Sequence, residues 1–129
     1  MNRIVLDASA VLAMLLGEPG AANVKDVLSD AAVTTVNLSE IAGHYARSGV
    51  AESDIRRVLD PLPIERVAFD EELAYGAATL LPATRAAGLS LGDRACLALA
   101  RRLDTPAMTA DRNWLGVARS IGVRVELIR

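Results

Sequence analysis

Short apolar runs that alternate with helical segments are the feature of this sequence that most limits its fold. Five such runs recur along the chain, and each of the first four is followed by a segment whose apolar residues repeat at helical spacing. This alternation favours a parallel sheet with crossover helices on both faces. We therefore predict a three-layer α/β/α sandwich with a short, mainly parallel central sheet. The expected strands span residues 3–6, 32–35, 64–69, 106–109 and 123–128.

Residues with strong capping preferences indicate where the helices begin. Ser90 is a good N-cap for a helix that ends before Pro106, because the residue before a proline disfavours the α region. Asp70 is expected to cap another helix. Asn37 and Glu40 have the spacing of a capping box, which predicts a third helix beginning at Asn37. The other helices are expected over residues 7–16, 19–29, 52–59 and 114–118.

Length and composition predict a single domain, residues 1–129, that works in the cytoplasm. A chain of 129 residues can bury about two-thirds of the surface that it exposes when unfolded. Cys96 is the only cysteine, so no internal disulfide can form. We see no secretory leader and no apolar stretch approaching the roughly 18 residues of a membrane span, so we expect no membrane partner.

The charge balance argues against bulk electrostatic binding to nucleic acid. The formal net charge is −2, although all but one of the 14 basic residues are arginines, Lys25 being the exception. Arginine can still bind phosphates locally, because its planar guanidinium forms paired hydrogen bonds. A bias in genomic base composition would explain the arginines equally well, and both explanations stay open.

Four acidic residues are the candidates for chemistry. Asp7 and Asp111 follow predicted strands, and Glu40 comes shortly after the strand predicted over residues 32–35. Asp93 lies in the first turn of the helix that Ser90 caps. Parallel strands end at one rim, where ligands of α/β folds bind, so we expect these acids to gather there. Each acid could instead be a helix cap, but four carboxylates at one rim repel one another unless a cation lies between them.

The residue types around the acids narrow the choice of cation. Carboxylates without a cluster of histidines or cysteines suit Mg²⁺ or Mn²⁺ and argue against structural zinc. His44 is the only histidine, and it is either a substrate contact or a partly exposed helix residue. Cys96 lies on an apolar helix face and is predicted to pack in the core. Trp114 either anchors the last helix or stacks on a nucleic-acid base.

Four motifs occur in a fixed order along the chain: I-V-L-D-A-S at 4–9, V-N-L-S-E at 36–40, L-S-L-G-D-R-A-C-L-A-L-A at 89–100 and T-A-D-R-N-W at 109–114. With these motifs at these separations, the chain resembles the PIN-domain ribonucleases, and in particular the VapC-type toxins of toxin–antitoxin pairs. The resemblance covers essentially all 129 residues.

The resemblance implies a PIN-like sandwich whose acids hold one or two Mg²⁺ or Mn²⁺ ions and cleave RNA. Asp7 and Asp93 would be the principal metal ligands, and Glu40 and Asp111 would complete the acidic pocket. Ser9 matches a small hydroxyl residue that helps to place the metal or the phosphate. Three arginines near the acids are candidate phosphate contacts: Arg94 and Arg112, which directly follow Asp93 and Asp111, and Arg47, which lies on the same predicted helix as Glu40.

The resemblance also implies partners, namely an RNA substrate, a second copy in a homodimer and a cognate antitoxin protein. Two alternatives stay open: a non-catalytic PIN-like binding or assembly module, and an RNA-processing nuclease that is not a toxin. Two other classes with acidic rims fit poorly. A response-regulator receiver needs a lysine late in the chain, whereas Lys25 is the only one, and a haloacid-dehalogenase-like phosphatase needs aspartate where Ser9 stands.

Overall fold

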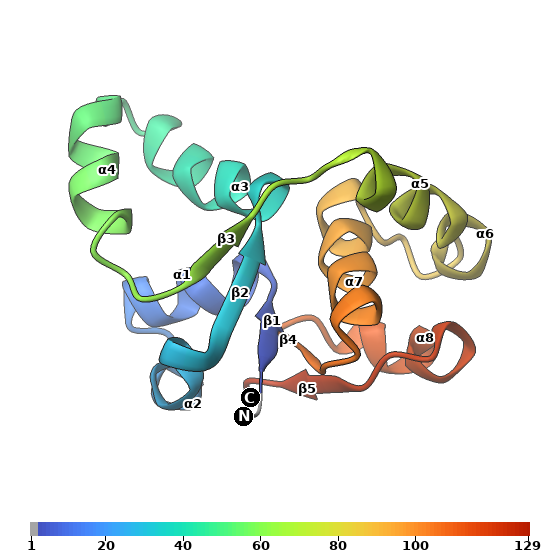
Figure 1. Cartoon of the computed structure of the whole chain (residues 1–129). Coiled ribbons are helices and arrows are strands. Elements are labelled where there is room, and N and C mark those ends of the chain that lie inside the picture. Colours follow the sequence, from blue (N-terminus) through green and yellow to red (C-terminus); the bar gives the residue numbers. More distant parts are fainter. Residues whose placement is uncertain (1–2) are drawn as a thin grey trace.

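The computed structural model describes residues 3–129, and within that range a five-stranded parallel sheet forms the centre of the molecule (Figure 1). The strands are β1 (Ile4–Leu6), β2 (Ala31–Thr34), β3 (Glu65–Val67), β4 (Ala107–Thr109) and β5 (Val125–Leu127). Their order across the sheet is β3-β2-β1-β4-β5. The central strand β1 pairs with β2 through Ile4 and Ala31, and with β4 through Val5 and Ala107.

Eight α-helices and two 3₁₀ turns connect the strands of the described range. None of these helices is long and apolar enough to span a membrane. The elements are α1 (Ala8–Leu16), α2 (Ala21–Val27), η1 (Leu28–Asp30), α3 (Thr35–Ala46), α4 (Glu52–Leu59), α5 (Glu71–Thr79), α6 (Leu81–Thr84), α7 (Leu91–Leu103), η2 (Arg112–Trp114) and α8 (Leu115–Ile121).

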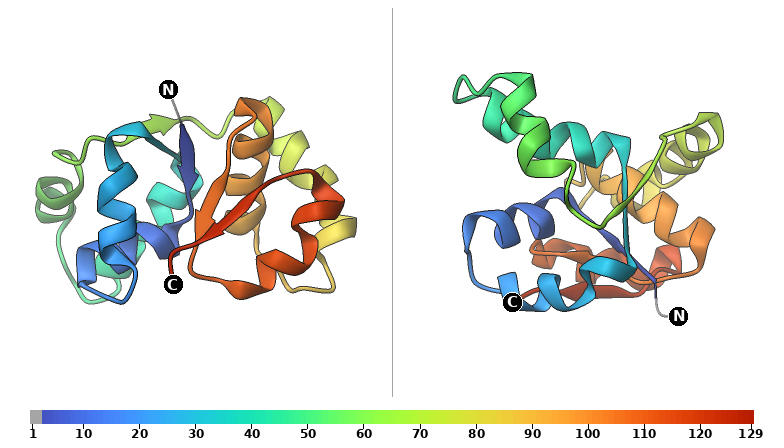
Figure 2. Two further views of the ribbon diagram at one scale, coloured as in Figure 1. Left: turned by 90° about the horizontal axis from the view of Figure 1, so that it is seen from below. Right: turned by 60° about the vertical axis from the view of Figure 1, so that its left-hand side comes forward.

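The helices form one layer on each face of the sheet, which Figure 2 shows from below. Helices α1 to α4 contribute to one apolar cluster, and α5, α7 and α8 contribute to the other. The central strand supplies both, since Val5 belongs to one cluster while Ile4 and Leu6 belong to the other. A strand buried on both faces is typical of parallel sheets. The predicted α/β/α sandwich with a parallel sheet is therefore confirmed.

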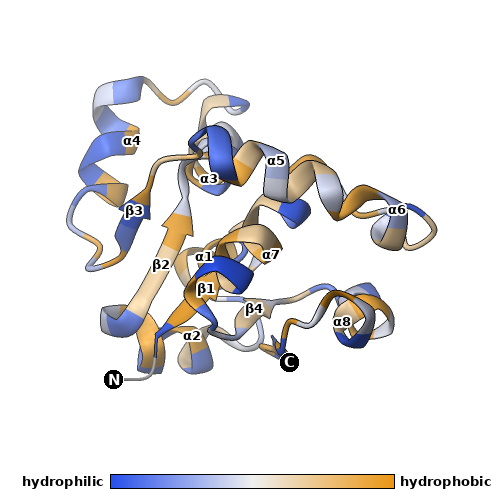
Figure 3. Cartoon of the chain, turned by 45° about the vertical axis from the view of Figure 1, so that its right-hand side comes forward, coloured by the Kyte–Doolittle hydropathy of each residue, from blue (hydrophilic) through white to orange (hydrophobic). Residues whose placement is uncertain are grey.

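Hydropathy follows these layers. In Figure 3, β1 and β2 are largely hydrophobic, whereas much of α4 is hydrophilic. Helix α4 has the predicted bounds and buries Ile55 and Leu59. Its outer side carries the ion pair between Arg56 and Glu52, 2.9 Å apart at Nε and Oε2. Exposed i,i+4 pairs of this kind stabilise a helix only slightly, so the buried apolar side chains hold α4 in place.

Helix α3 begins earlier than predicted. Its N-cap is Thr34, whose Oγ1 accepts a hydrogen bond of 3.1 Å from the backbone N–H of Asn37. Thr35, expected at the end of a strand, is the first residue of the helix. The prediction that Asn37 caps this helix was wrong: its side chain is fully buried inside the first turn and takes part in the site described below.

The entry to α2 also differs from the prediction, because Pro19 precedes the helix instead of lying in its first turn. The N-cap is Gly20, with φ at 94°. A Cβ at this position would lie 2.5 Å from the carbonyl oxygen of Ile128, so glycine is needed for the close approach as well as for the backbone angle. Asn23 Nδ2 donates to the same carbonyl at 2.9 Å, which ties α2 to the end of the chain.

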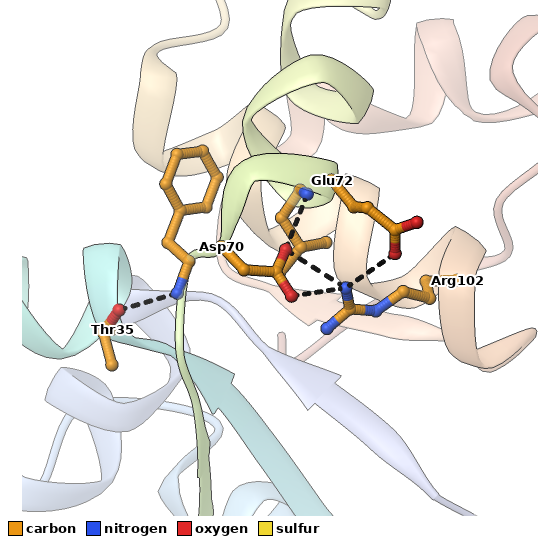
Figure 4. A network of polar contacts seen from close by, with 6 residues as sticks. Thr35, Asp70, Glu72 and Arg102 are labelled. Atoms are coloured by element: carbon orange, nitrogen blue, oxygen red, sulfur yellow. Dashed lines mark hydrogen bonds and ion pairs between the residues drawn. The ribbon is translucent and has the colours of Figure 1, made fainter.

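The connection from β3 to α5 carries the chain from one helical layer to the other (Figure 4). The N–H of Phe69 donates to Thr35 Oγ1 at 3.0 Å, at the start of α3. Asp70 is the N-cap of α5, as predicted, and accepts from Leu73 N at 2.8 Å. Arg102 Nη1 of α7 lies 3.1 Å from Asp70 Oδ2. The hydrogen bonds from Leu73 and Arg102 hold the pKa of Asp70 below its ordinary value.

Two side chains with open roles belong to the core beside α7. Trp114 is completely buried, which leaves no ring face for a base and identifies it as an anchor of the chain before α8. Cys96 is completely buried as well, and burial followed by the charges of nearby acids raises the pKa of its thiol well above the ordinary value. Cys96 therefore packs as predicted.

Candidate functional site

The carboxyl ends of the three central strands meet at one rim of the sheet. Asp7 follows β1 directly, and Asp111 follows β4 by two residues. Helix α3, which carries Glu40, begins directly after β2. Helix α7 contacts α3 and β1, and its first turn brings Asp93 toward the same rim.

Asp7 has the backbone of an N-cap but uses its carboxylate differently. Its own N–H donates to Met108 O of β4 at 2.9 Å, so the main chain is held by the sheet. Within the described residues its side chain makes no capping hydrogen bond to α1. Instead Oδ2 accepts from Ser9 Oγ at 2.7 Å and from Thr109 Oγ1 at 3.0 Å. The residue is only 5% exposed.

The two hydroxyls connect Asp7 to the loop that carries Asp111. Ser9 Oγ accepts from Ala110 N at 3.0 Å, and Thr109 Oγ1 accepts from Asp111 N at 3.1 Å. The hydroxyl oxygens themselves lie 3.2 Å apart. This arrangement fixes the Asp7 carboxylate and couples its position to the backbone of Asp111.

Glu40 is held by a buried amide. Asn37 Nδ2 donates to Glu40 Oε1 at 2.9 Å and to the carbonyl oxygen of Gly92 at 3.0 Å. Asn37 Oδ1 accepts from Thr34 Oγ1 at 2.7 Å. The Glu40 carboxylate also lies against Gly92, where an added Cβ would overlap it. The first turn of α3 is therefore joined to the first turn of α7 at the residue before Asp93.

Asp93 and Asp111 both make local capping contacts. Asp93 Oδ2 accepts from Ser90 N at 2.9 Å, and Ser90 Oγ accepts from Asp93 N at 3.2 Å, so the two residues form a capping box. Asp111 Oδ1 accepts from Asn113 N at 2.9 Å and caps η2. Each of these capping contacts occupies one oxygen of a carboxylate that has two.

The acids raise one another's cost of ionisation. Burial raises the pKa of Asp7 to about 6, and the charges of Asp93 and Glu40 add to this effect against the hydrogen bonds from Ser9 and Thr109. Burial likewise raises the pKa of Glu40, and Asp93 adds to it. Burial raises the pKa of Asp93, with a contribution from Asp111. The four carboxylates thus lie within electrostatic range at one rim, and burial together with the neighbouring acids disfavours the charged forms of Asp7, Glu40 and Asp93.

The donor set fits a hard divalent cation that keeps water ligands. Carboxylate oxygens are the ligands that Mg²⁺ and Mn²⁺ prefer. Among the described residues, no three His, Cys, Asp or Glu side chains lie close enough together to hold a metal ion on their own, so water would have to supply most of the ligands. Mg²⁺ is commonly held by one or two carboxylates while water completes its shell, so an open rim of repelling carboxylates suits it better than a closed zinc site.

The three candidate arginines differ in their relation to the acids. Arg94 is half-buried, and its charge opposes the rise in the pKa of Asp93. Its Nη1 donates to Ala77 O of α5 at 3.0 Å, while its Nε is buried without a hydrogen-bond partner in the described part of the chain. Arg112 is exposed and donates to the carbonyl oxygen of Arg129 at 3.0 Å. Arg47 is exposed at the C-terminal end of α3.

His44 lies on α3 one turn after Glu40 and is partly exposed. Its ring meets the ring of the adjacent Tyr45 edge to face, with centroids 5.2 Å apart. This contact agrees with the interpretation of His44 as a helix residue with local packing.

Three residues of the site were not predicted to belong to it: Asn37, Gly92 and Thr109. Thr109 stands two residues before Asp111 and could have been noticed as a hydroxyl at a strand end. Gly92 directly precedes Asp93, and a glycine within a helix is a sign of close approach by another group. Asn37 was interpreted as a cap because its spacing from Glu40 fits that role.

The fold and the site together define an α/β protein with a cluster of acidic residues at the carboxyl rim of a parallel sheet. The family model of the PIN domain matches residues 4–120, and the chain belongs to this family. The family resemblance found in the motifs is therefore confirmed. PIN domains are in general nucleases that use divalent metal ions. No curated protein sequence matches the chain significantly.

Solved structures with the same fold include three toxin–antitoxin systems. The chain is similar to one in the DNA-bound VapBC complex of Salmonella typhimurium, with 15% identity over 100% of both chains and a TM-score of 0.75. A toxin–antitoxin complex of Klebsiella pneumoniae gives 15% identity over 98% of both chains and a TM-score of 0.73. A member of the VapBC family from Mycobacterium tuberculosis gives 23% identity over 100% and 99% of the chains and a TM-score of 0.60.

Proposed function

We propose that this chain is a Mg²⁺- or Mn²⁺-dependent endoribonuclease that hydrolyses RNA phosphodiester bonds and acts as the toxin of a type II toxin–antitoxin pair. The observation that carries the proposal is the buried Asp7 carboxylate, whose pKa is raised to about 6 by burial and by the charges of Asp93 and Glu40. A protein that only needed a helix cap at Asp7 would have no reason to surround it with further acids.

The chemistry assigns a role to each residue of the rim. When bound, a divalent ion supplies an activated water and a Lewis acid for phosphodiester hydrolysis. Asp7 and Asp93 are the principal ligands, and Glu40 and Asp111 complete the pocket. Ser9, with Thr109, orients the Asp7 carboxylate through the hydrogen bonds to Oδ2.

Three arginines are the candidate phosphate contacts. Arg94 is favoured over the other two arginines because its positive charge acts to lower the pKa of Asp93, one of the four acids. Arg47 and Arg112 are exposed and able to contact a longer RNA. If any of them binds phosphate, its replacement by glutamine will lower RNA affinity and reduce the salt dependence of binding.

Cleavage of total cellular RNA tests the proposed activity. We expect discrete products with the purified chain in Mg²⁺ or Mn²⁺, and none with EDTA or with Asp7→Asn. Asp26→Asn is the matched control, because Asp26 is an exposed acid on α2, outside the acidic rim. Cleavage that persists in EDTA, or that Asp7→Asn leaves unchanged, would refute the proposed metal site.

The toxin role rests on the solved structures with this fold, which are named as toxin–antitoxin complexes. We propose a cognate antitoxin as the partner, a homodimer as the active form and the cytoplasm as the location. Expression of the chain should arrest growth, and co-expression of a small protein encoded beside it should relieve the arrest. Growth without arrest, together with cleavage of a defined precursor RNA, would favour an RNA-processing nuclease instead.

A non-catalytic binding or assembly module is the second candidate function. It is favoured by the local contacts of Asp93 and Asp111, both of which are explained as caps. Thermal unfolding with and without Mn²⁺ discriminates between the two candidates. A metal site gains free energy of unfolding as RT ln(1 + [L]/Kd), whereas a module without metal affinity gains none.

A further inference from the structure

Glu40 reaches the rim through a residue that sequence patterns explained as a cap. The side chain of Asn37 is fully buried, and its amide uses both kinds of polar atom. Its oxygen accepts from Thr34 Oγ1, while its nitrogen donates to Glu40 Oε1 and to Gly92 O. The reversed orientation of the amide would place two oxygens against each other at Glu40 and at Gly92, so the network permits only one orientation.

Gly92 supplies the space for the same carboxylate. A Cβ at this position would overlap the carboxylate atoms of Glu40. Gly92 lies in the first turn of α7 with an ordinary helical backbone, so its backbone angles do not require glycine. The close approach of Glu40 is therefore the physical reason for the absence of a side chain there.

We propose that Asn37 and Gly92 are positioning residues that seat the Glu40 carboxylate against the first turn of α7, beside Asp93. Asn37 holds the carboxylate by a hydrogen bond, and Gly92 leaves room for it. Neither residue acts on RNA itself. This inference rests on the proposed function, because the seat matters through the divalent ion that Glu40 and Asp93 help to hold.

Gly92→Ala is the sharpest test, since its Cβ displaces the Glu40 carboxylate although Asn37 and all four acidic residues stay in the sequence. Alanine is a better helix former than glycine, so we expect a Tm without metal at or above that of the parent chain. We expect the apparent Kd for Mn²⁺, from metal-dependent thermal shifts, to weaken about 10-fold and kcat to fall about 10- to 100-fold. The KM for RNA should stay within about twofold, because the change acts on an outer-shell contact and leaves the RNA-binding surface unchanged.

Gly116→Ala is the matched control. Gly116 occupies the second position of α8, as Gly92 does in α7, and within the described residues an added Cβ there meets nothing within 4 Å. The same gain in helix propensity should therefore appear without any change in Mn²⁺ affinity or cleavage.

Asn37→Ala tests the second proposed positioning residue. It removes a buried polar group, so its control is Thr84→Val, which removes the buried hydroxyl that donates to Leu80 O at 2.8 Å, in the α5–α6 region. We expect both variants to lower the Tm, and only Asn37→Ala to weaken Mn²⁺ binding and lower kcat.

The outcomes separate the two proposals. If the parent chain binds Mn²⁺ and cleaves RNA while Gly92→Ala and Asn37→Ala match their controls in Kd and kcat, the positioning roles are wrong and the proposed nuclease stands. If the parent chain neither gains stability from Mn²⁺ nor cleaves RNA, the proposed function is wrong, and the positioning roles of Asn37 and Gly92 are wrong with it.

Discussion

Asp7 and Asp70 occupy the same kind of position in the chain but opposite environments. Each comes after a strand and is the N-cap residue of the next helix. Asp70 is exposed, and both the backbone of Leu73 and the guanidinium of Arg102 donate to its carboxylate. Asp7 is buried and, within the described residues, makes no capping hydrogen bond.

The difference appears in the ionisation of the two carboxyl groups. The hydrogen bonds from Leu73 and Arg102 lower the pKa of Asp70, so its charged form stabilises the fold. Burial and the neighbouring acids raise the pKa of Asp7 to about 6, so its charged form destabilises the fold at neutral pH. One aspartate thus serves the structure, whereas the other opposes it, and a residue of the second kind calls for a functional explanation.

The largest expected effect follows from replacing Asp7. Asp7→Asn should reduce RNA cleavage by at least about 100-fold, because it removes the charge of a proposed metal ligand, whose loss exceeds that of an outer-shell contact. The same change should raise the free energy of unfolding at pH 7 by up to about 3 kcal/mol, since the pKa rises from 3.8 to about 6 in the folded state. Cleavage assays and urea denaturation measure the two effects.

Asp70→Asn is the comparison variant, which should retain cleavage and gain no stability. A loss of stability in Asp7→Asn, or equal effects of the two substitutions on cleavage, would contradict the distinction between the two residues.

The pH dependence of stability should show the same contrast with a smaller effect. A folded-state pKa that is raised means that the folded chain binds the proton of Asp7 more tightly than the unfolded chain. The contribution of Asp7 to the free energy of unfolding should therefore decrease as pH rises from about 4 to about 6, and should stay constant above that range. Asp70, with its lowered pKa, contributes in the opposite direction: its stabilisation is present above about pH 4 and is lost in more acidic solution.

Subtracting the unfolding curve of Asp7→Asn from that of the parent chain isolates the Asp7 contribution, provided that EDTA removes all metal. The difference should grow between pH 4 and pH 6 in favour of the variant. A difference that is independent of pH would show that Asp7 titrates normally in the folded chain.

Sequence patterns predicted the architecture because the information for it is local. Ile4 to Leu6 form a run that is buried on both faces, and the helix after Ser90 carries its cap and its apolar stripe within a few residues. Strand and helix ends shifted where a second capping residue was available, as at Thr34. Local sequence alone does not decide whether Thr34 or Asn37 is the N-cap of α3. The buried hydrogen bond from Asn37 to Gly92 O, 55 residues away, favours Thr34 as the N-cap.

The acids of the candidate site could be predicted from the sequence, but the residues that orient them could not. Parallel strands bring Asp7 and Asp111 to one rim whatever the details of packing. The hydroxyl of Thr109 reaches Asp7 across a separation of 102 residues, and no spacing rule in a single sequence gives such a contact. The residue type alone shows that a side chain is acidic, but only the tertiary structure shows which residue orients it.

The smallest expected effects come from removing the two contacts of Asp70 separately, the ion pair with Arg102 and the capping hydrogen bond from Leu73. Asp70→Asn keeps an excellent N-cap and loses only the ion pair with Arg102, so the Tm should fall slightly, as should that of Arg102→Gln. Asp70→Ala loses the hydrogen bond from Leu73 N as well and should lower the Tm more. High salt should reduce the effect of Asp70→Asn, because an exposed pair is screened, and should leave the additional loss in Asp70→Ala largely unchanged. If the two substitutions at Asp70 were equal at all salt concentrations, the ion pair and not the cap would be the contact through which this aspartate stabilises the fold.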